Sequence, residues 1–256
     1  MSETGVQTLD RTLDIIELLA VEPEGIGVSE IGLRLGLHKS TVHRLLNALA
    51  VRGYIEKEAK FGMYKLGLKF IEISSHFLNK LELKTEALSY LRKLSETVGQ
   101  TVHLAILSGS EAIYIEKIDS LSSIRMYSQI GRRIPVHCSA IGKVLLSGLK
   151  NDELKKITDE IEYKGFTPFT IKTSEDLINE VKKVKKAGYA TDNEEHEEGI
   201  RCIAAPIYDY TGRVIASVST SGDKKIISKD REEEISKYVI EAVSYTHLTL
   251  PTNREV

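Results

Sequence analysis

The chain has 256 residues, of which 41% are hydrophobic and 28% charged, and its formal net charge is −2. This length is sufficient for two domains, and no apolar run approaches the roughly 20 residues that a membrane-spanning helix needs. The two cysteines, Cys138 and Cys202, lie far apart in a chain that lacks the basic-then-apolar order of a signal peptide, so we expect no disulfide framework and a reducing, cytoplasmic location.

The first predicted element is a helix over residues 8–21. Thr8 is a candidate N-cap, and Pro23 and Gly25 follow where the helical pattern stops. The apolar face of this helix is expected to contain Leu9, Leu13, Ile16 and either Leu19 or Ala20. Such a face would cover the apolar stripe of the two helices that come next.

Residues 28–53 are predicted to form two short helices joined by a tight turn. Ser29 is a candidate N-cap of the first helix, and Gly36 is placed to end it. The apolar positions of this helix are Ile31, Leu33 and Leu35. In the second helix, apolar residues at i, i+3, i+4 and i+7 form a stripe that must pack on a neighbour, namely Val42, Leu45, Leu46 and Leu49.

The opposite face of the second helix is polar and partly cationic. Its members are Lys39, Ser40, Thr41, His43, Arg44 and Asn47. A recognition helix in the major groove of DNA presents this composition in its N-terminal half. Two amphipathic helices in any bundle would show the same pattern with a solvated polar face, so this segment alone leaves both interpretations open.

A basic hairpin is predicted directly after these helices, with strands at 54–57 and 63–66 around a turn that contains Gly62. Such a hairpin is a wing, and Lys57, Lys60 and Lys65 would bring cations to DNA phosphates. Residues 31–65 contain seven lysines and arginines against two glutamates, a net charge of +5 in an otherwise acidic chain. The three features in series predict a winged helix-turn-helix that binds DNA.

The pattern of elements in the rest of the chain, after the wing, predicts an α+β domain with a largely antiparallel sheet. A helix over 66–81 would connect it to the wing and offer a second apolar face for dimerisation. Strands are expected at 101–107, 112–118, 124–128, 200–209 and 213–221, and helices at 84–98, 139–149, 150–161, 174–187 and 229–243. Ser139 and Ser174 are candidate caps. Residues 244–256 match neither periodicity, and we expect a non-native tail there.

Three features of this domain could bind a ligand. Free backbone amides at the helix start, at Ala140, Ile141 and Gly142, would favour an anion, although an ordinary capped helix shows the same pattern. Ser217, Ser219 and Ser221 share one face of a strand, and buried hydroxyls there would need polar partners.

The third feature is an acidic run between Asp192 and Glu198, which is either a solvated loop or, with His196, a divalent metal site. No second histidine has helical spacing to His196, so we expect no metal. Cys138 beside His137, or Cys202 with another histidine, would be the candidates for a thiol nucleophile, but no triad pattern supports catalysis.

From residue 6 to 243 the chain resembles IclR-type bacterial transcriptional regulators. The segments that carry the resemblance are TLDRTLDIIELLA, LGLHKSTVHRLLNAL, IPVHCSAIGKVLL, GYATDNEEHEEGIRCIAAPI and the final STSG strand. It implies a winged helix-turn-helix domain at 6–66, a linker helix at 67–83 and a GAF-like effector-binding domain at 84–243. It also implies homodimers, often paired into tetramers, on palindromic double-stranded operators, with small carboxylates as effectors and no cofactor. Regulators of 2-keto-3-deoxygluconate or pectin catabolism are the type most similar.

The resemblance also implies roles for individual residues. The expected DNA-binding residues are Ser29, Lys39, Ser40, Thr41, His43, Arg44, Asn47 and Lys60. The expected effector-binding residues are Met126, Ala140, Ile141, Asp192, Cys202, Ser219 and Ser221. The amides of Ala140 and Ile141 would bind a carboxylate, and Asp192 would accept a hydroxyl or hydrated carbonyl. We therefore expect a ligand-responsive regulator of a catabolic operon. The alternatives are a thiol- or metal-dependent enzyme, or a helix-turn-helix protein whose C-terminal domain only dimerises.

Overall fold

The computed structural model describes residues 6–58, 61–79, 82–120 and 128–249. The chain divides into two compact units, residues 1–80 and 81–256. No helix within the described ranges is long and apolar enough to cross a membrane.

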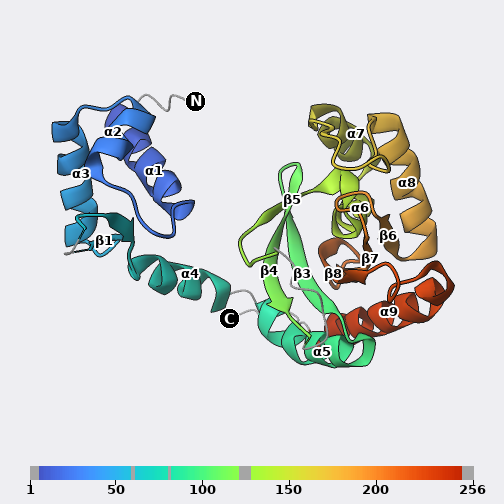
Figure 1. Ribbon diagram of the computed structural model, residues 1–256. Helices are drawn as coiled ribbons and strands as arrows, with labels where there is room; N and C mark the ends of the chain where they lie inside the picture. Colours follow the sequence, from blue (N-terminus) through green and yellow to red (C-terminus); the bar gives the residue numbers. More distant parts are fainter. Residues whose placement is uncertain (1–5, 59–60, 80–81, 121–127, 250–256) are drawn as a thin grey trace. The chain divides into compact units, whose positions relative to one another are not determined.

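The first unit is a three-helix core followed by a two-stranded antiparallel hairpin and a further helix (Figure 1). Its elements are α1 (Gln7–Ala20), α2 (Val28–Leu35), α3 (Lys39–Val51), β1 (Ile55–Lys57), β2 (Tyr64–Leu66) and α4 (Lys69–Asn79). The predicted stripe of α3 is entirely buried, against Ile15 and Leu19 of α1 and Ile31 of α2. Gly36 ends α2 with φ of 63°, in the left-handed region that a glycine adopts without strain. The winged helix-turn-helix is thus confirmed.

Several details of the first two helices were predicted wrongly. The N-cap of α1 is Val6 and that of α2 is Gly27, so Thr8 and Ser29 lie inside their helices and cap neither. The core face of α1 is centred on Ile15 and Leu19, which leaves Leu9 51% exposed and Leu13 46% exposed. Leu33 of α2 is likewise exposed rather than part of the core.

The second unit is a six-stranded antiparallel sheet with helices on both faces, which confirms the α+β class. The strand order is β5-β4-β3-β8-β7-β6. The strands are β3 (Thr101–Ser108), β4 (Glu111–Ile118), β5 (Arg133–Pro135), β6 (Ala190–Asn193), β7 (Ile200–Tyr208) and β8 (Val214–Asp223). The helices are α5 (Glu82–Val98), α6 (Ala140–Ser147), α7 (Asn151–Glu160), α8 (Ser174–Ala187) and α9 (Glu232–Thr249), with 3-10 turns η1 (Val136–Cys138) and η2 (Lys229–Arg231).

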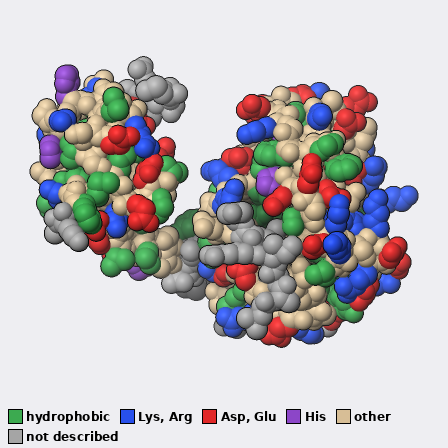
Figure 2. Space-filling model, viewed as in Figure 1, with side chains coloured by type: hydrophobic (Ala, Val, Ile, Leu, Met, Phe, Trp, Pro, Cys, Tyr) green, Lys and Arg blue, Asp and Glu red, His purple; other side chains and the backbone are tan. Residues whose placement is uncertain are grey.

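Each face of this sheet has its own core. On one face α5 and α9 pack against the strands, with Leu91, Leu104, Ile203 and Val239 among the buried residues. On the other face lie α6 and α8, with Val144, Leu146 and Leu177 buried. Figure 1 shows the sheet between these two helix layers, and Figure 2 shows lysine and arginine side chains gathered over the outer side of α8.

The second unit also departs from the sequence prediction at β5, at β6, at the start of α8 and at the end of α9. The edge strands β5 and β6 were not expected, because they are only three and four residues long. Helix α8 is capped by Thr173, whose hydroxyl accepts from the Asp176 amide, and not by Ser174. Helix α9 continues to Thr249, although no helical pattern was expected beyond residue 243. The expected strand at 124–128 lies mostly outside the described residues.

Candidate functional site

A cavity of about 510 Å³ lies on the α6 face of the sheet in the second unit. Six of the seven expected effector-binding residues line it, namely Ala140, Ile141, Asp192, Cys202, Ser219 and Ser221. The seventh, Met126, lies outside the described residues. The structure therefore brings together residues of β6, β7, β8 and the start of α6. Ala140 and Ser221, the two ends of this set, are 81 positions apart in the sequence.

Ala140 and Ile141, in the first turn of α6, line the cavity. Ser139 is the N-cap, as predicted, and its hydroxyl oxygen accepts from the Gly142 amide at 3.2 Å. The expectation of a free amide at Gly142 was therefore wrong, because the cap occupies it. Within the described residues, no protein acceptor is found for the amides of Ala140 and Ile141. These two N–H groups and the positive end of the helix dipole together favour a carboxylate at this position.

Asp192 of β6 also lines the cavity and is 3% exposed. Its Oδ1 accepts from the Glu195 amide at 2.8 Å. Burial, and after it the negative charge of Glu195, raise the pKa of Asp192 to about 7, while the Lys143 ammonium acts in the opposite direction. A carboxyl group with this pKa changes between donor and acceptor near neutral pH.

The floor of the cavity is formed by β7 and β8. Cys202 lies opposite Ser221 in the ladder, and Ala204 lies opposite Ser219. Both serines are buried and line the cavity, so that a polar ligand could supply partners for their hydroxyls. Ser217 shares their face of β8 but does not line the cavity. Its hydroxyl donates to the Ala205 carbonyl at 3.3 Å.

Phe166 covers part of the cavity from the loop between α7 and α8. Its ring lies between those of His137, at 6.1 Å between centroids, and His196, at 5.0 Å. His137 Nε2 lies 3.1 Å from the Lys164 carbonyl oxygen, to which it donates a hydrogen bond, so this histidine ties the loop to η1. Burial lowers the pKa values of His137 and His196, which favours neutral rings around Phe166.

Sequence reasoning missed several residues of the cavity. Tyr114 on β4, Ser128, Arg132 and Phe166 all line it. The alternation of β4 could have indicated that Tyr114 faces the same side as Ala112, but nothing in the sequence indicates that residues 161–173 fold back over the sheet. His196, first considered as a metal ligand, lines the cavity beside Phe166.

Thiol and metal chemistry were the alternatives for this domain. Burial raises the pKa of the Cys202 thiol well above its ordinary range, and burial likewise raises that of Cys138, so both groups are weak nucleophiles at neutral pH. Among the residues that the structure describes, no group of three or more histidine, cysteine, aspartate or glutamate side chains is arranged to hold a metal ion.

The second candidate surface is the polar face of α3 in the first unit. Lys39, Ser40, His43, Arg44 and Asn47 are exposed, and Thr41 is half-buried. Within the described ranges, none of these six side chains makes a hydrogen bond or ion pair, so they are available to base edges and phosphates. Ser29 is exposed in the first turn of α2, and Lys60 lies outside the described residues.

Comparisons with known proteins identify a family for each of the two units. Residues 8–59 match the family described as the IclR helix-turn-helix domain, and residues 75–246 match the family described as the C-terminal domain of the bacterial transcriptional regulator IclR. The chain is 40% identical over 230 residues to the HTH-type transcriptional regulator KdgR of Escherichia coli, covering 90% of this chain and 87% of KdgR. It is 39% identical over 216 residues to the regulator XynR of the same species, covering 84% and 86%.

A solved structure gives the same result. The IclR protein of Thermotoga maritima is 32% identical, covers 95% of this chain and 98% of its own, and superposes with a TM-score of 0.81. The relatives are named as transcriptional regulators and not as enzymes. The chain belongs to the IclR family of bacterial transcriptional regulators.

Proposed function

We propose that this regulator controls a catabolic operon in the cytoplasm and senses a small carboxylate, a keto acid or a sugar acid, in the cavity of its second unit. The observation that carries the proposal is that one cavity is lined both by Ala140 and Ile141, whose amides have no acceptor within the described residues, and by the buried Asp192. An anionic group would bind the amides, and the carbonyl or hydroxyl groups of the ligand would reach Asp192, Ser219 and Ser221. Met126 is proposed as an apolar contact.

The proposed division of the chain is a DNA-binding domain at 6–66, a linker helix at 67–83 and an effector domain at 84–243. We propose that Ser29, Lys39, Ser40, Thr41, His43, Arg44, Asn47 and Lys60 contact the operator. Seven cations against two anions in residues 31–65 support this interface.

We further propose that the chain forms a homodimer, or a dimer of dimers, on a palindromic operator. Exposed apolar side chains on α1 and α4 support this, since Leu9, Ile71 and Phe77 are 51%, 62% and 62% exposed. Light scattering of the full chain tests this proposal, and a monomer at all concentrations would contradict it.

Thermal unfolding of the full chain tests the sensing function. We would screen pyruvate, D-gluconate, 2-keto-3-deoxy-D-gluconate and benzoate. A ligand at 100 times its Kd should stabilise the second unit by about 2.7 kcal/mol, a shift of roughly 5–10 °C. Ser219→Ala should reduce the shift, while Ser217→Ala, on the same strand face but outside the cavity, should retain it. If no keto acid or sugar acid stabilises the protein, the results would favour the alternative in which the second unit only dimerises.

A further inference from the structure

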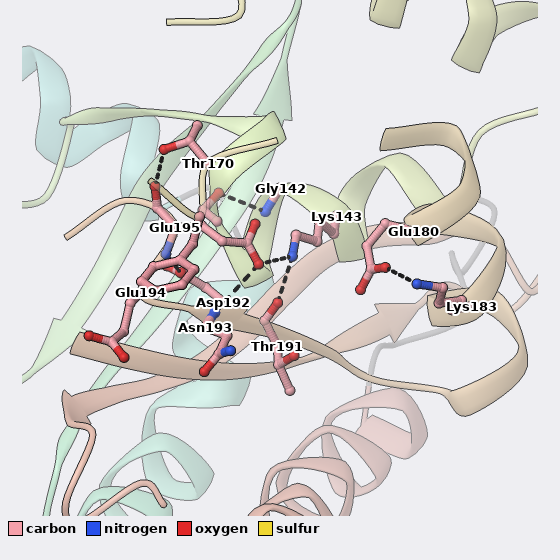
Figure 3. Close-up of polar contacts among 12 residues, drawn as sticks. Gly142, Lys143, Thr170, Glu180, Lys183, Thr191, Asp192, Asn193, Glu194 and Glu195 are labelled. Atoms are coloured by element: carbon pink, nitrogen blue, oxygen red, sulfur yellow. Dashed lines mark hydrogen bonds and ion pairs between the residues drawn. The ribbon is translucent and has the colours of Figure 1, made fainter. Parts of the chain in front are cut away.

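Glu195 connects three parts of the second unit beside the cavity (Figure 3). Its carboxylate accepts from Lys143 Nζ of α6 at 2.6 Å. Its carbonyl oxygen accepts from the Thr170 hydroxyl, in the loop that carries Phe166, at 2.6 Å. Its amide donates to Asp192 at 2.8 Å. One residue therefore fixes the positions of a helix, a covering loop and a ligand-facing carboxyl group.

Lys143 itself does not line the cavity. It is 1% exposed, and its ammonium donates to the Thr191 carbonyl at 2.7 Å as well as to Glu195. The side chain thus leaves the same helix turn that presents the Ala140 and Ile141 amides and reaches the strand that carries Asp192. A buried ion pair of this kind costs desolvation and is weak evidence for stability, so a role in positioning is the more informative interpretation.

The pair also controls the electrostatic environment of Asp192. Glu195 places a negative charge beside it from the turn after β6, and Lys143 places a positive charge beside it from α6. The other titratable groups that act on it are Cys202 of β7, Tyr114 of β4 and Cys138 of η1. Burial raises the pKa of each of these three groups, which keeps them neutral. Arg132, Arg133, His196, Glu197 and Glu111 also line the cavity, but the charges that act most on Asp192 are those of Glu195 and Lys143.

We propose that the Lys143–Glu195 ion pair is a positioning device that holds Asp192 in the cavity wall and sets whether its carboxyl group donates or accepts a hydrogen bond. The inference rests on the proposed sensing function, because that function gives Asp192 its ligand. A protonated Asp192 donates to a keto or carboxylate oxygen, whereas an ionised Asp192 accepts only from hydroxyl groups and repels a second anion. The pair thereby biases the cavity towards ligands that present an acceptor at this position.

Titration of Asp192 in the ligand-free full chain tests the proposal directly. The readout is the ¹³C shift of its side-chain carboxyl carbon against pH, assigned by its loss in Asp192→Asn. Glu195→Gln removes the neighbouring negative charge, and we expect the midpoint to fall by about one pH unit or more. The proposal is overturned if the midpoint in Glu195→Gln stays within about 0.3 of the wild-type value.

Two further variants show whether the shift comes from the Glu195 charge itself. Lys143→Met combined with Glu195→Gln removes both buried charges, and the midpoint should still fall, by less, because Glu195 acts more strongly on Asp192 than Lys143 does. The matched control is Lys224→Met, which removes the exposed Lys224–Glu194 pair of 2.9 Å in the same turn and should leave the midpoint unchanged. A fall as large in Lys224→Met as in Glu195→Gln would contradict the proposal.

Ligand binding measured as a function of pH separates this inference from the proposed function. For an acid that binds the wild type, Kd should rise about tenfold per pH unit above the Asp192 midpoint, and Glu195→Gln should move that rise to lower pH. A chain that binds none of the four acids, yet shows the expected titration shift, overturns the sensing function and supports the control of Asp192. A bound acid whose pH profile is the same in both proteins overturns the inference alone.

Discussion

Asp192 on β6 lies directly opposite Cys202 on β7 in the antiparallel ladder. Cys202 in turn lies opposite Ser221 on β8, so the three side chains form a row across the cavity floor. Asp192 and Ser221 are buried and Cys202 is half-buried, so the ionisation of Asp192 and that of Cys202 oppose each other. Burial, together with the Asp192 carboxyl group, raises the pKa of the Cys202 thiol.

We therefore expect both thiols of the folded chain to be unreactive. At about pH 8, Cys138 and Cys202 should react with iodoacetamide at least about 100-fold more slowly than glutathione, since only the thiolate is nucleophilic. Mass spectrometry of time points measures the rate for each cysteine, and unfolding in urea should restore reactivity. Rapid alkylation of Cys202 in the folded chain would revive the thiol-enzyme alternative.

Asp192→Asn should make the second unit more resistant to urea at high pH. The pKa of Asp192 is raised from 3.8 to about 7. The contribution of Asp192 to folding stability is therefore fully present below about pH 3.8 and is lost as the pH rises to 7, because between these values only the unfolded chain ionises. Because asparagine cannot ionise, the variant should gain stability relative to the wild type between about pH 4 and about pH 8, by about 4 kcal/mol as an upper limit.

The control for that prediction has the opposite sign. Lys155 first, and Ser174 after it, lower the pKa of the exposed Asp159. Its contribution is present above the unfolded pKa and is lost as the pH falls, so Asp159→Asn should lose rather than gain stability at high pH. If both variants change stability in the same direction with pH, the assignment for Asp192 is wrong.

Arg44→Ala should weaken operator binding by about 1–3 kcal/mol if Arg44 reads a base edge. Its side chain is exposed on the polar face of α3, in the half of the helix that would enter the major groove. The operator would be a duplex selected by the wild-type chain from random DNA, and affinity would be measured by fluorescence anisotropy. Arg52→Ala, beyond the C-terminal end of the same helix, is the matched control. Equal losses in the two variants would indicate only phosphate contacts.

Thr170→Val should destabilise the covering loop. The Thr170 hydroxyl oxygen accepts from the amides of Phe166 and Thr167, at 3.0 and 2.9 Å, and donates to Glu195 at 2.6 Å. Valine leaves buried donors without partners, which we expect to cost about 1–3 kcal/mol in urea unfolding and to speed proteolysis at 161–173. Thr97→Val removes one exposed bond to Lys93 of the same helix and should change stability by less than about 0.5 kcal/mol.

Gly142→Ala should disturb the start of α6. A Cβ at this position would collide with the Cα and carbonyl oxygen of Val136, so the helix or η1 must move. We expect a loss of about 1–3 kcal/mol despite the higher helix propensity of alanine, together with weaker carboxylate binding. Gly165→Ala, where the nearest atom lies 3.9 Å away at Lys172, is the control, and equal losses in both variants would argue against a specific collision.

The sequence predicted the features whose signal is local. The i, i+3, i+4, i+7 stripe of Val42 to Leu49 and the cap at Ser139 follow from helix geometry alone, and both are confirmed. The period-2 spacing of Ser219 and Ser221 correctly predicted a common buried face.

Features that depend on packing between distant segments were not predictable. Phe166 lies in a loop without periodicity, and its position is set by hydrogen bonds from Thr167 and Thr170 to residues 25 to 28 positions away. The acidic composition around Asp192 suggested a solvated loop, whereas β6 pairs with β7 there and buries the carboxyl group. Leu9 and Leu13 have core spacing, but Ile15 and Leu19 occupy the interior.

The two faces of the sheet separate specificity from stability along a single strand. On β8, Ala216 and Val218 belong to the core beneath α5 and α9, while Ser219 and Ser221 face the cavity. Substitution at Ser219 and Ser221 can therefore change ligand specificity without altering the apolar interior. Deletion of one residue before position 216 would turn the serines towards the core and the apolar residues towards the cavity. The protein would then lose both ligand binding and its folded core.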